Sequence, residues 1–287
     1  MHLFLRLLGC LLLPLLCLNC RSAAAPQRPV VLDIGHHIGD GGASSPKSYQ
    51  GKAMDEVSFW YRYCYDIKRV VEAAGYPCLV CNRGEAPTRP PLADDARRAG
   101  VIQLRQRQKS GRYASELHPD RYAAGQVSAD FAIRRQALCV VFLHHNGTSS
   151  RLVEGPSPSM ILHNRYNGKP LADALCRALN TEVLNHGLDN GGKPCEPAVR
   201  FRAADPSAGW MNALDDSGIP AAVTEVTDLS NRRHLDYLSD DAQARSFAES
   251  IGRGIVDFLH SYDPQQAHMR LDDSKPDEGS NGKTIRY

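Results

Sequence analysis

Residues 29–42 read PVVLDIGHHIGDGG, an apolar run that passes directly into a glycine-rich segment with two adjacent histidines. A short apolar run rich in β-branched residues, which begins at proline and ends at glycine, predicts a buried β-strand over 29–34. Glycine permits tight turns and close approach of the backbone. The bend that follows either aims an imidazole of His36 or His37 at a bound group, or is an ordinary surface loop.

The rest of the chain repeats this alternation of strand and helix patterns. Further buried strands are predicted at PCLVC (77–81), ALCVVFL (137–143), SMILH (159–163) and AAVTEV (221–226). Apolar residues recur at helical spacing in 57–71, 171–179 and 247–259. This order predicts an α/β protein, a three-layer α/β/α sandwich around a mostly parallel central sheet.

The composition indicates a globular, exported protein. A chain of 287 residues with 42% hydrophobic residues can bury a large core in at most two domains. Residues 1–25 have the apolar stretch and small-residue end of a signal peptide. A lipid-modified cysteine at Cys17 or Cys20 is the alternative, and only then do we expect a membrane attachment. One domain is expected over 29–261, followed by a disordered tail at 263–287.

Charge is nearly balanced over the whole chain and uneven in one segment. A net charge of +2 does not favour nucleic acid as a partner. The segment from about 83 to 121 holds nine basic and five acidic residues and interrupts the strand and helix pattern. We expect an insertion there, either a solvated surface excursion or a surface that meets an anionic polymer.

Six cysteines follow the predicted signal: Cys64, Cys78, Cys81, Cys139, Cys176 and Cys195. An even number in an exported protein permits disulfides. The pair in CLVC resembles a redox or metal motif. On a strand, however, two residues three apart face opposite sides, with alpha carbons roughly 10 Å apart, too far for a bridge. We therefore expect structural or separately paired cysteines.

Three predicted strands end in, or contain, polar residues that are costly to bury. His36 follows the first strand, His144 and His145 end the third, and Glu225 lies within AAVTEV. Functional groups of open α/β sheets gather at the carboxyl ends of the strands. A catalytic zinc ion takes three protein ligands, and Glu56 at the start of the next helix is a natural third beside the histidines. Glu225 then remains as the proton carrier.

Each of these residues also has a plainer interpretation. A histidine at a strand end is often only hydrogen-bonded or solvated. Glu56 at a helix start interacts favourably with the helix dipole, and Glu225 could be a buried acid satisfied by backbone donors. The wide spacing between Glu56 and the histidines carries no local signature such as HExxH. The residues alone leave the metal site as one of two alternatives.

Four blocks, taken together, resemble a known family. GHHIGDGGA (35–43), Glu56 before a long helix, FLHHN (142–146) and PAAVTEVTDLSN (220–231) occur in that order. They are similar to the blocks GHGG-x-D-x-GA, helix-opening Glu, S-x-H-x-N and PA-V-x-E-x-GF-x-SN. This is the pattern of the type-3 amidase family, the zinc-dependent N-acetylmuramoyl-L-alanine amidases. The resemblance spans about Pro29 to Ser261.

The resemblance implies a role for four residues. It implies that His36, Glu56 and His144 bind zinc, with His144 selected over His145 by its distance from the asparagine, and that Glu225 is the catalytic glutamate. The chain departs from the pattern at three places. His37 and Ile38 replace glycines, Phe142 replaces serine, and the pair Thr227-Asp228 replaces Gly-Phe. None of these departures removes a ligand or the base, but they leave the substrate preference open.

The family further implies an enzyme that hydrolyses the amide between N-acetylmuramic acid and the L-alanine of the peptidoglycan stem peptide. We expect such an enzyme to be periplasmic or secreted, with an activator protein as a conceivable partner. The basic insertion could orient the acidic wall polymer or cover the site. Two alternatives remain: another zinc-dependent amidohydrolase or carboxypeptidase acting on soluble peptides, and a noncatalytic wall-binding module.

Overall fold

The structure is a computed structural model, and it describes residues 28–35, 42–81, 123–147, 150–189, 191–199 and 209–262. The predicted signal peptide at 1–25, the insertion at about 83–121 and the tail at 263–287 lie outside the described residues. None of the described helices is long and apolar enough to cross a membrane.

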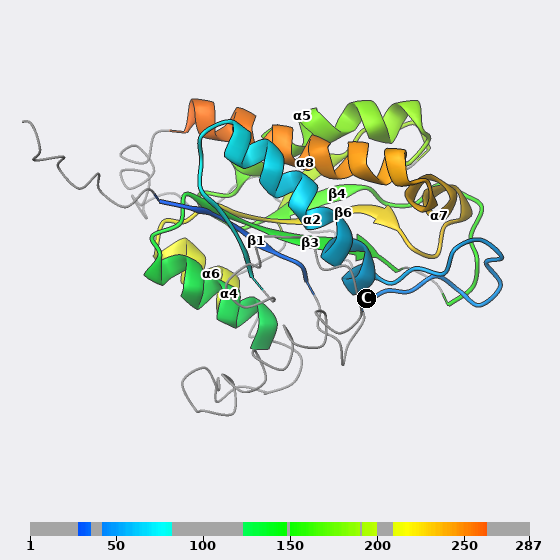
Figure 1. Cartoon of the computed structure of the whole chain (residues 1–287), viewed down its shortest axis with the longest axis horizontal. Coiled ribbons are helices and arrows are strands. Elements are labelled where there is room, and N and C mark those ends of the chain that lie inside the picture. The colour runs from blue at the N-terminus through cyan, green and yellow to red at the C-terminus, as the bar shows by residue number, and fades with distance from the viewer. Residues whose placement is uncertain are drawn as a thin grey trace, which may run out of the picture.

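A six-stranded sheet forms the centre of the molecule (Figure 1). Its order is β2-β1-β3-β6-β4-β5, and all neighbours are parallel except the antiparallel pair β4 and β6. The strands are β1 (Val30–Asp33), β2 (Cys78–Cys81), β3 (Cys139–Asn146), β4 (Met160–His163), β5 (Glu196–Val199) and β6 (Ala221–Asp228). The predicted mostly parallel sheet is confirmed.

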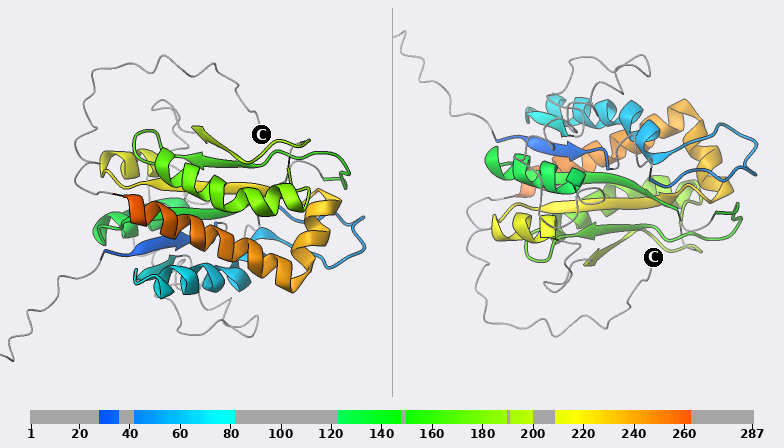
Figure 2. Two further views of the ribbon diagram at one scale, coloured as in Figure 1. Left: turned by 90° about the horizontal axis from the view of Figure 1, so that it is seen from above. Right: turned by 90° about the horizontal axis from the view of Figure 1, so that it is seen from below.

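Helices cover both faces of the sheet (Figure 2). One layer holds α2 (Glu56–Ala73), α5 (Lys169–Asn185) and α8 (Asp241–Ser261), and the other holds α4 (Ala123–Arg134) and α6 (Gly209–Asp216). The short helix α7 (Arg232–Ser239) follows β6. The three-layer sandwich predicted from the sequence is therefore confirmed.

Alternation along the strands divides the core between the two layers. In β3, Val141 and Leu143 pack into the cluster under α2, α5 and α8, whereas Val140 and Phe142 pack against α4 and α6. Successive side chains of a strand point to opposite faces, so each central strand supplies both clusters. The two cysteines of β2 follow the same rule, with Cys78 and Cys81 in different clusters, as the sequence predicted.

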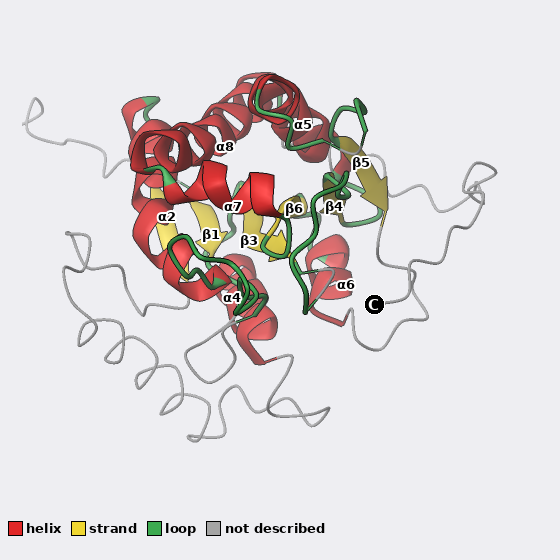
Figure 3. Ribbon diagram, turned by 90° about the vertical axis from the view of Figure 1, so that its right-hand side faces the viewer, coloured by secondary structure: helices red, strands yellow, loops and turns green. Residues whose placement is uncertain are grey.

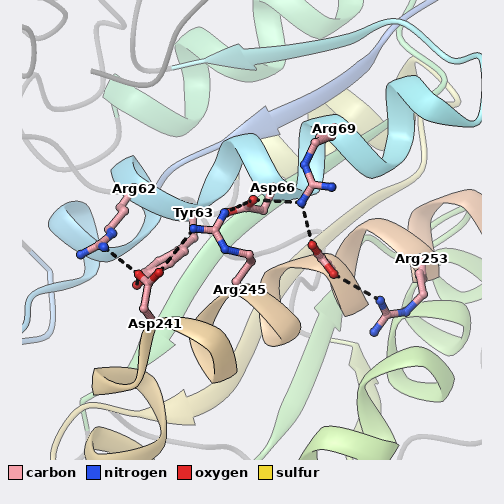
Figure 4. A network of polar contacts seen from close by, with 8 residues as sticks. Arg62, Tyr63, Asp66, Arg69, Asp241, Arg245 and Arg253 are labelled. Atoms are coloured by element: carbon pink, nitrogen blue, oxygen red, sulfur yellow. Dashed lines mark hydrogen bonds and ion pairs between the residues drawn. The ribbon is translucent and has the colours of Figure 1, made fainter. Parts of the chain in front are cut away.

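Helix α2 begins where a side chain can cap it and is held to α8 by charge. Asp55 has extended backbone angles and accepts a hydrogen bond from the Ser58 N–H, which is N-cap geometry. Further along, Asp66 accepts from Arg245 of α8 at 2.6 Å, within a network of arginines and carboxylates between the two helices (Figure 4). The network holds the middle of α2 against α8.

Candidate active site

The carboxyl ends of β1, β3 and β6 lie at one edge of the sheet, because these three strands are parallel (Figure 3). His144 and Glu225 are direct partners in the register of β3 and β6. Paired residues of neighbouring strands are about 5 Å apart and point to the same face. Two of the predicted site residues are therefore neighbours through strand register alone.

Glu56 reaches the same edge from the first turn of α2. Its backbone N–H donates to the carbonyl of Ala43 at 3.1 Å, and its Oε2 accepts from the N–H of Ala43 at 2.5 Å. Its Oε1 accepts from the backbone N–H of His145 at 2.6 Å. These contacts bind the helix start both to Ala43 and to the end of β3. They hold the carboxylate, which is only 2% exposed, in one orientation.

The ring of His144 lies between Glu56 and the end of β1. Its Nδ1 is 3.6 Å from Oε1 of Glu56. A Cβ atom added to Gly35 would lie 3.2 Å from Nε2 of His144 and 2.7 Å from the carbonyl oxygen of Leu143. Gly35 has a φ of +78°, so glycine is required there for both conformation and space. The chain thus leaves β1 in contact with the His144 ring.

His145 points away from this group, as expected for a strand neighbour of His144. Its ring stacks on Trp60 with centroids 4.7 Å apart and contacts Phe59 edge-on. Its Nδ1 forms a hydrogen bond with the hydroxyl of Thr227, and burial lowers its pKa to about 3. His145 is therefore a neutral core histidine whose backbone, rather than its ring, contacts Glu56.

Glu225 is 8% exposed and lies between two strands. His144 is its register partner on β3, and Met160 is its partner on β4. Asn146 donates from Nδ2 to the Glu225 carbonyl at 2.9 Å and to the Pro158 carbonyl at 3.1 Å. The Asn146 side chain thereby fixes the backbone of Glu225 where the β3 register shifts.

Sequence reasoning missed Asp33, the last residue of β1. Its Oδ1 accepts from the Gly35 N–H at 2.6 Å, and its other oxygen accepts from the Ser128 hydroxyl of α4. An aspartate that bonds the backbone two residues later is a common turn former. The signal was present in the sequence as Asp-Ile-Gly at the end of the first strand. Asp33 shapes the exit of β1 beside His144.

Sequence reasoning also missed Asp228, the last residue of β6, and His234 in the helix that follows, α7. Asp228 accepts from the N–H and the hydroxyl of Ser230, and its own N–H donates to Nδ1 of His234 at 2.8 Å. Burial lowers the pKa of His234 to about 4. These bonds form the turn between β6 and α7, in front of the sheet edge in Figure 3.

His36, the remaining predicted ligand, lies outside the described residues, as do His37 and Asp40. Within the described part of the chain, no three potential metal ligands come together. The structure brings Glu56 and His144 into one group and places Glu225 beside them. A side chain on Gly35, the residue before His36 in the sequence, would meet the same histidine ring.

A carboxylate and an imidazole with converging polar atoms are ligand types that zinc binds. A second carboxylate in register beside the imidazole provides a proton acceptor close to such a centre. The arrangement therefore suits metal-assisted hydrolysis.

Comparison with known proteins identifies the family. A family model described as N-acetylmuramoyl-L-alanine amidase, Amidase_3, matches residues 30–257. No curated protein sequence matches the chain.

Solved structures show the same fold. The amidase AmiC2 of Nostoc punctiforme superposes with a TM-score of 0.51 at 16% identity, covering 83% of this chain and 99% of that one. The catalytic domain of CwlV from Bacillus (Paenibacillus) polymyxa var. colistinus superposes with a TM-score of 0.51 at 18% identity, covering 82% of this chain and 100% of that one. CwlD of Clostridioides difficile was solved in complex with the GerS lipoprotein. It superposes with a TM-score of 0.50 at 15% identity, covering 82% of this chain and 100% of that one.

The family model covers most of the chain, from the first strand to the last helix. Both the sheet and the paired positions of His144 and Glu225 fall within the matched residues. The chain belongs to the Amidase_3 family of N-acetylmuramoyl-L-alanine amidases, and it is a peptidoglycan amidase.

Proposed function

We propose that this amidase uses zinc held by His36, Glu56 and His144, and that Glu225 transfers the proton. The bond cleaved joins the lactyl group of N-acetylmuramic acid to the L-alanine of the stem peptide. The observation that carries the proposal is the approach of His144 Nδ1 to Glu56 Oε1, 3.6 Å, beside the register partner Glu225.

The residues present fit a zinc ion. Glu56 is held rigidly through two backbone N–H groups, which matches the need of a metal site for preoriented ligands. A Cβ atom added to Gly35 would lie 3.2 Å from Nε2 of His144, and His36 is the next residue in the sequence. When bound, zinc supplies a Lewis acid that polarises the amide carbonyl and makes water a nucleophile at neutral pH.

Glu225 performs the proton transfers in this proposal. Its carboxylate accepts a proton from the attacking water and delivers it to the nitrogen of the departing L-alanine amine. The carboxylate must be aimed for both transfers, and its strand is held by Asn146 on one side and by β4 on the other. Burial at 8% exposure limits competing contact with bulk water.

We propose further that the enzyme acts outside the cytoplasm, because its substrate is the cell wall. A signal peptide at 1–25 is part of this proposal, with a lipid anchor at Cys17 or Cys20 as the alternative. An activator protein is compatible with the proposal: CwlD was solved in complex with the GerS lipoprotein.

The first test is cleavage of isolated peptidoglycan sacculi, followed by mass spectrometry of the released products. The expected products are intact stem peptides with a free L-alanine amino group and glycan strands with free lactyl groups. Glu225→Gln keeps the shape of the side chain and removes the proton acceptor, so we expect at least a thousandfold lower rate with zinc still bound.

Metal content tests the other half of the proposal. We expect about one zinc ion per purified chain, and loss of activity with a chelator that zinc restores. Activity on soluble acyl amino acids with none on sacculi would instead identify another amidohydrolase. Binding to sacculi with no cleavage by the zinc-loaded wild-type protein would leave only a wall-binding module.

A further inference from the structure

Two buried thiols lie together in the core cluster under α5, where Glu196, the residue after Cys195, is two strands from Glu225 by way of Met160. Cys176 is in the middle of α5, and Cys195 directly precedes β5. Their Sγ atoms are 3.2 Å apart, in hydrogen-bonding contact. A disulfide bond is about 2.05 Å long, so a movement of roughly 1 Å would join them.

The backbone at Cys195 is already fixed against the same face of the helix. Its N–H donates to Oδ1 of Asn180 at 3.0 Å. Asn180 is one helical turn beyond Cys176, and residues four apart lie on one face of a helix. Two side chains of α5, one helical turn apart, therefore contact Cys195. Asn180 contacts the backbone N–H of Cys195, and Cys176 contacts its sulfur. The approach of the sulfurs does not depend on one flexible side chain.

We propose that Cys176 and Cys195 form a structural disulfide in the native protein. The step is a thiol–disulfide exchange with a small oxidised disulfide such as glutathione disulfide. Two cysteine thiols and one glutathione disulfide give the protein disulfide and two glutathione thiols. One S–S bond forms in the protein and one breaks in the oxidant, and both protons go to the glutathione products. This proposal goes beyond the proposed function and does not rest on it.

The thiols are enclosed once the fold is complete, with Cys176 4% and Cys195 3% exposed. The hydrogen bond between the two thiols and burial both raise the pKa of Cys176, so little reactive thiolate forms in the folded protein. The bond therefore forms during folding, before the segment ahead of β5 closes over α5. For the same reason, reductants attack the finished bond slowly.

The position of the bond explains what it stabilises. β5 is a strand of four residues at the edge of the sheet, and among the described strands it pairs with β4 alone. The segment between α5 and β5 holds three glycines with positive φ: Gly187, Gly191 and Gly192. Glycines raise the conformational entropy that the unfolded segment loses on folding. A crosslink between cysteines 19 positions apart in the sequence reduces that loss and holds the edge strand on the sheet.

The other cysteines provide an internal comparison. Cys78 and Cys81 face opposite sides of β2. The Cys64 thiol contacts the carbonyl of Tyr61 in its own helix. Cys78 and Cys139 pair with Val30 from opposite sides, so they are two strands apart, roughly 10 Å, which is too far for a bridge. We expect these four to remain thiols.

The test is differential alkylation of the full chain after folding with a glutathione redox buffer. The protein is denatured and alkylated with light iodoacetamide, then reduced and alkylated with the heavy reagent. Cys176 and Cys195 should carry the heavy label, whereas Cys64, Cys78, Cys81 and Cys139 carry the light one. Peptide mapping without reduction should find the peptides of Cys176 and Cys195 linked.

A thermal measurement checks the effect on the fold. The oxidised wild type should melt roughly 5–10 °C higher than the protein refolded under reducing conditions. Cys176→Ala and Cys195→Ala should abolish this difference, whereas the buried control Cys139→Ala should keep it. Light label on Cys176 and Cys195 in the wild type, or a bridge between any other pair, would overturn the proposal. Neither of these wild-type results depends on whether a variant folds.

Discussion

The two edges of the sheet hold similar polar residues and use them differently. At the carboxyl edge of β3 and β6, His144 and Glu56 face each other and Glu225 is beside them. At the opposite edge, the ring of His163 donates to the Asn164 carbonyl at 2.8 Å, and both polar atoms of the Asn164 amide bond backbone groups next to β6.

Strand direction explains the difference. β4 is antiparallel to β6, so the histidine that ends it pairs with Ala222, near the amino end of β6. At that edge polar side chains complete the backbone hydrogen bonds of loops, and each contact is satisfied locally. At the other edge an imidazole and two carboxylates gather from three elements. A buried polar residue indicates chemistry only when side chains converge on one another.

The sharpest test of this comparison replaces the histidine at each edge in a separate variant. We expect His144→Ala to lower the rate on sacculi by about a thousandfold, because a zinc ligand is lost, and to lower zinc content below half. His163→Asn is the matched variant at the opposite edge. It should keep zinc and stay within a few-fold of the wild-type rate, at a lower Tm. Equal loss of activity in both variants would remove the distinction between the edges.

The carboxylates permit a second matched pair. Glu56 and Asp215 each accept two backbone N–H groups, Asp215 from Arg165 and Tyr166 at 3.1 Å. Glu56→Gln and Asp215→Asn each place an amide NH₂ against a backbone donor, which costs roughly 1–3 kcal/mol of stability.

Only Glu56→Gln should also lose zinc, with activity falling a few hundredfold, because only Glu56 is proposed as a ligand. Denaturant unfolding and metal analysis on the same samples separate the two effects. Full zinc content in Glu56→Gln would exclude Glu56 as a ligand.

Much of this arrangement could be predicted from the sequence. All five apolar runs proposed as strands are strands, because each is short, buried on both faces and bounded by turn residues. β5, with the sequence EPAV, was missed because it is an edge strand with little apolar content. The helices α4, α6 and α7 were missed for other reasons: α6 and α7 have only eight residues each, too few for the helical spacing to repeat, and α4 has a weakly periodic sequence.

The candidate site was predictable where strand direction alone decides position. His144 and Glu225 could be placed together because parallel strands end at one edge. The direction of β4 could not be read from SMILH, and that direction is what removes His163 from the site. The contact of Glu56 with the His145 backbone was equally hidden, because it depends on how α2 docks on the sheet. The ligand role of His36 stays a prediction.

Glycines at the two edges give a third, smaller contrast. A Cβ at Gly35 would meet the Leu143 carbonyl at 2.7 Å and the His144 ring, and a Cβ at Gly168 would meet the Ala221 carbonyl at 2.5 Å. Gly35→Ala should displace the His144 ring and reduce activity about a hundredfold. Gly168→Ala should lower Tm and leave the activity of the folded protein unchanged. Kinetics below the Tm of both variants decide between these outcomes.

The smallest expected effect concerns stability and pH. Burial lowers the pKa of His234 to about 4, from an ordinary value of 6.5. Between these two values the unfolded chain binds a proton that the folded protein excludes, so the free energy of unfolding falls as the pH drops below 6.5. At pH 5 the loss from this group is about 2 kcal/mol, roughly a thirtyfold change in the unfolding constant.

His234→Asn isolates this contribution, because Oδ1 of asparagine can replace Nδ1 as the acceptor for the Asp228 N–H and does not titrate. Denaturant unfolding at pH 7.5 and pH 5 should show a smaller difference for His234→Asn than for the wild type. If His234→Asn changes stability in acid but keeps the wild-type rate on sacculi, α7 secures the turn after β6 and takes no part in the reaction. Identical pH dependence in both proteins would mean that His234 is not held neutral by the fold.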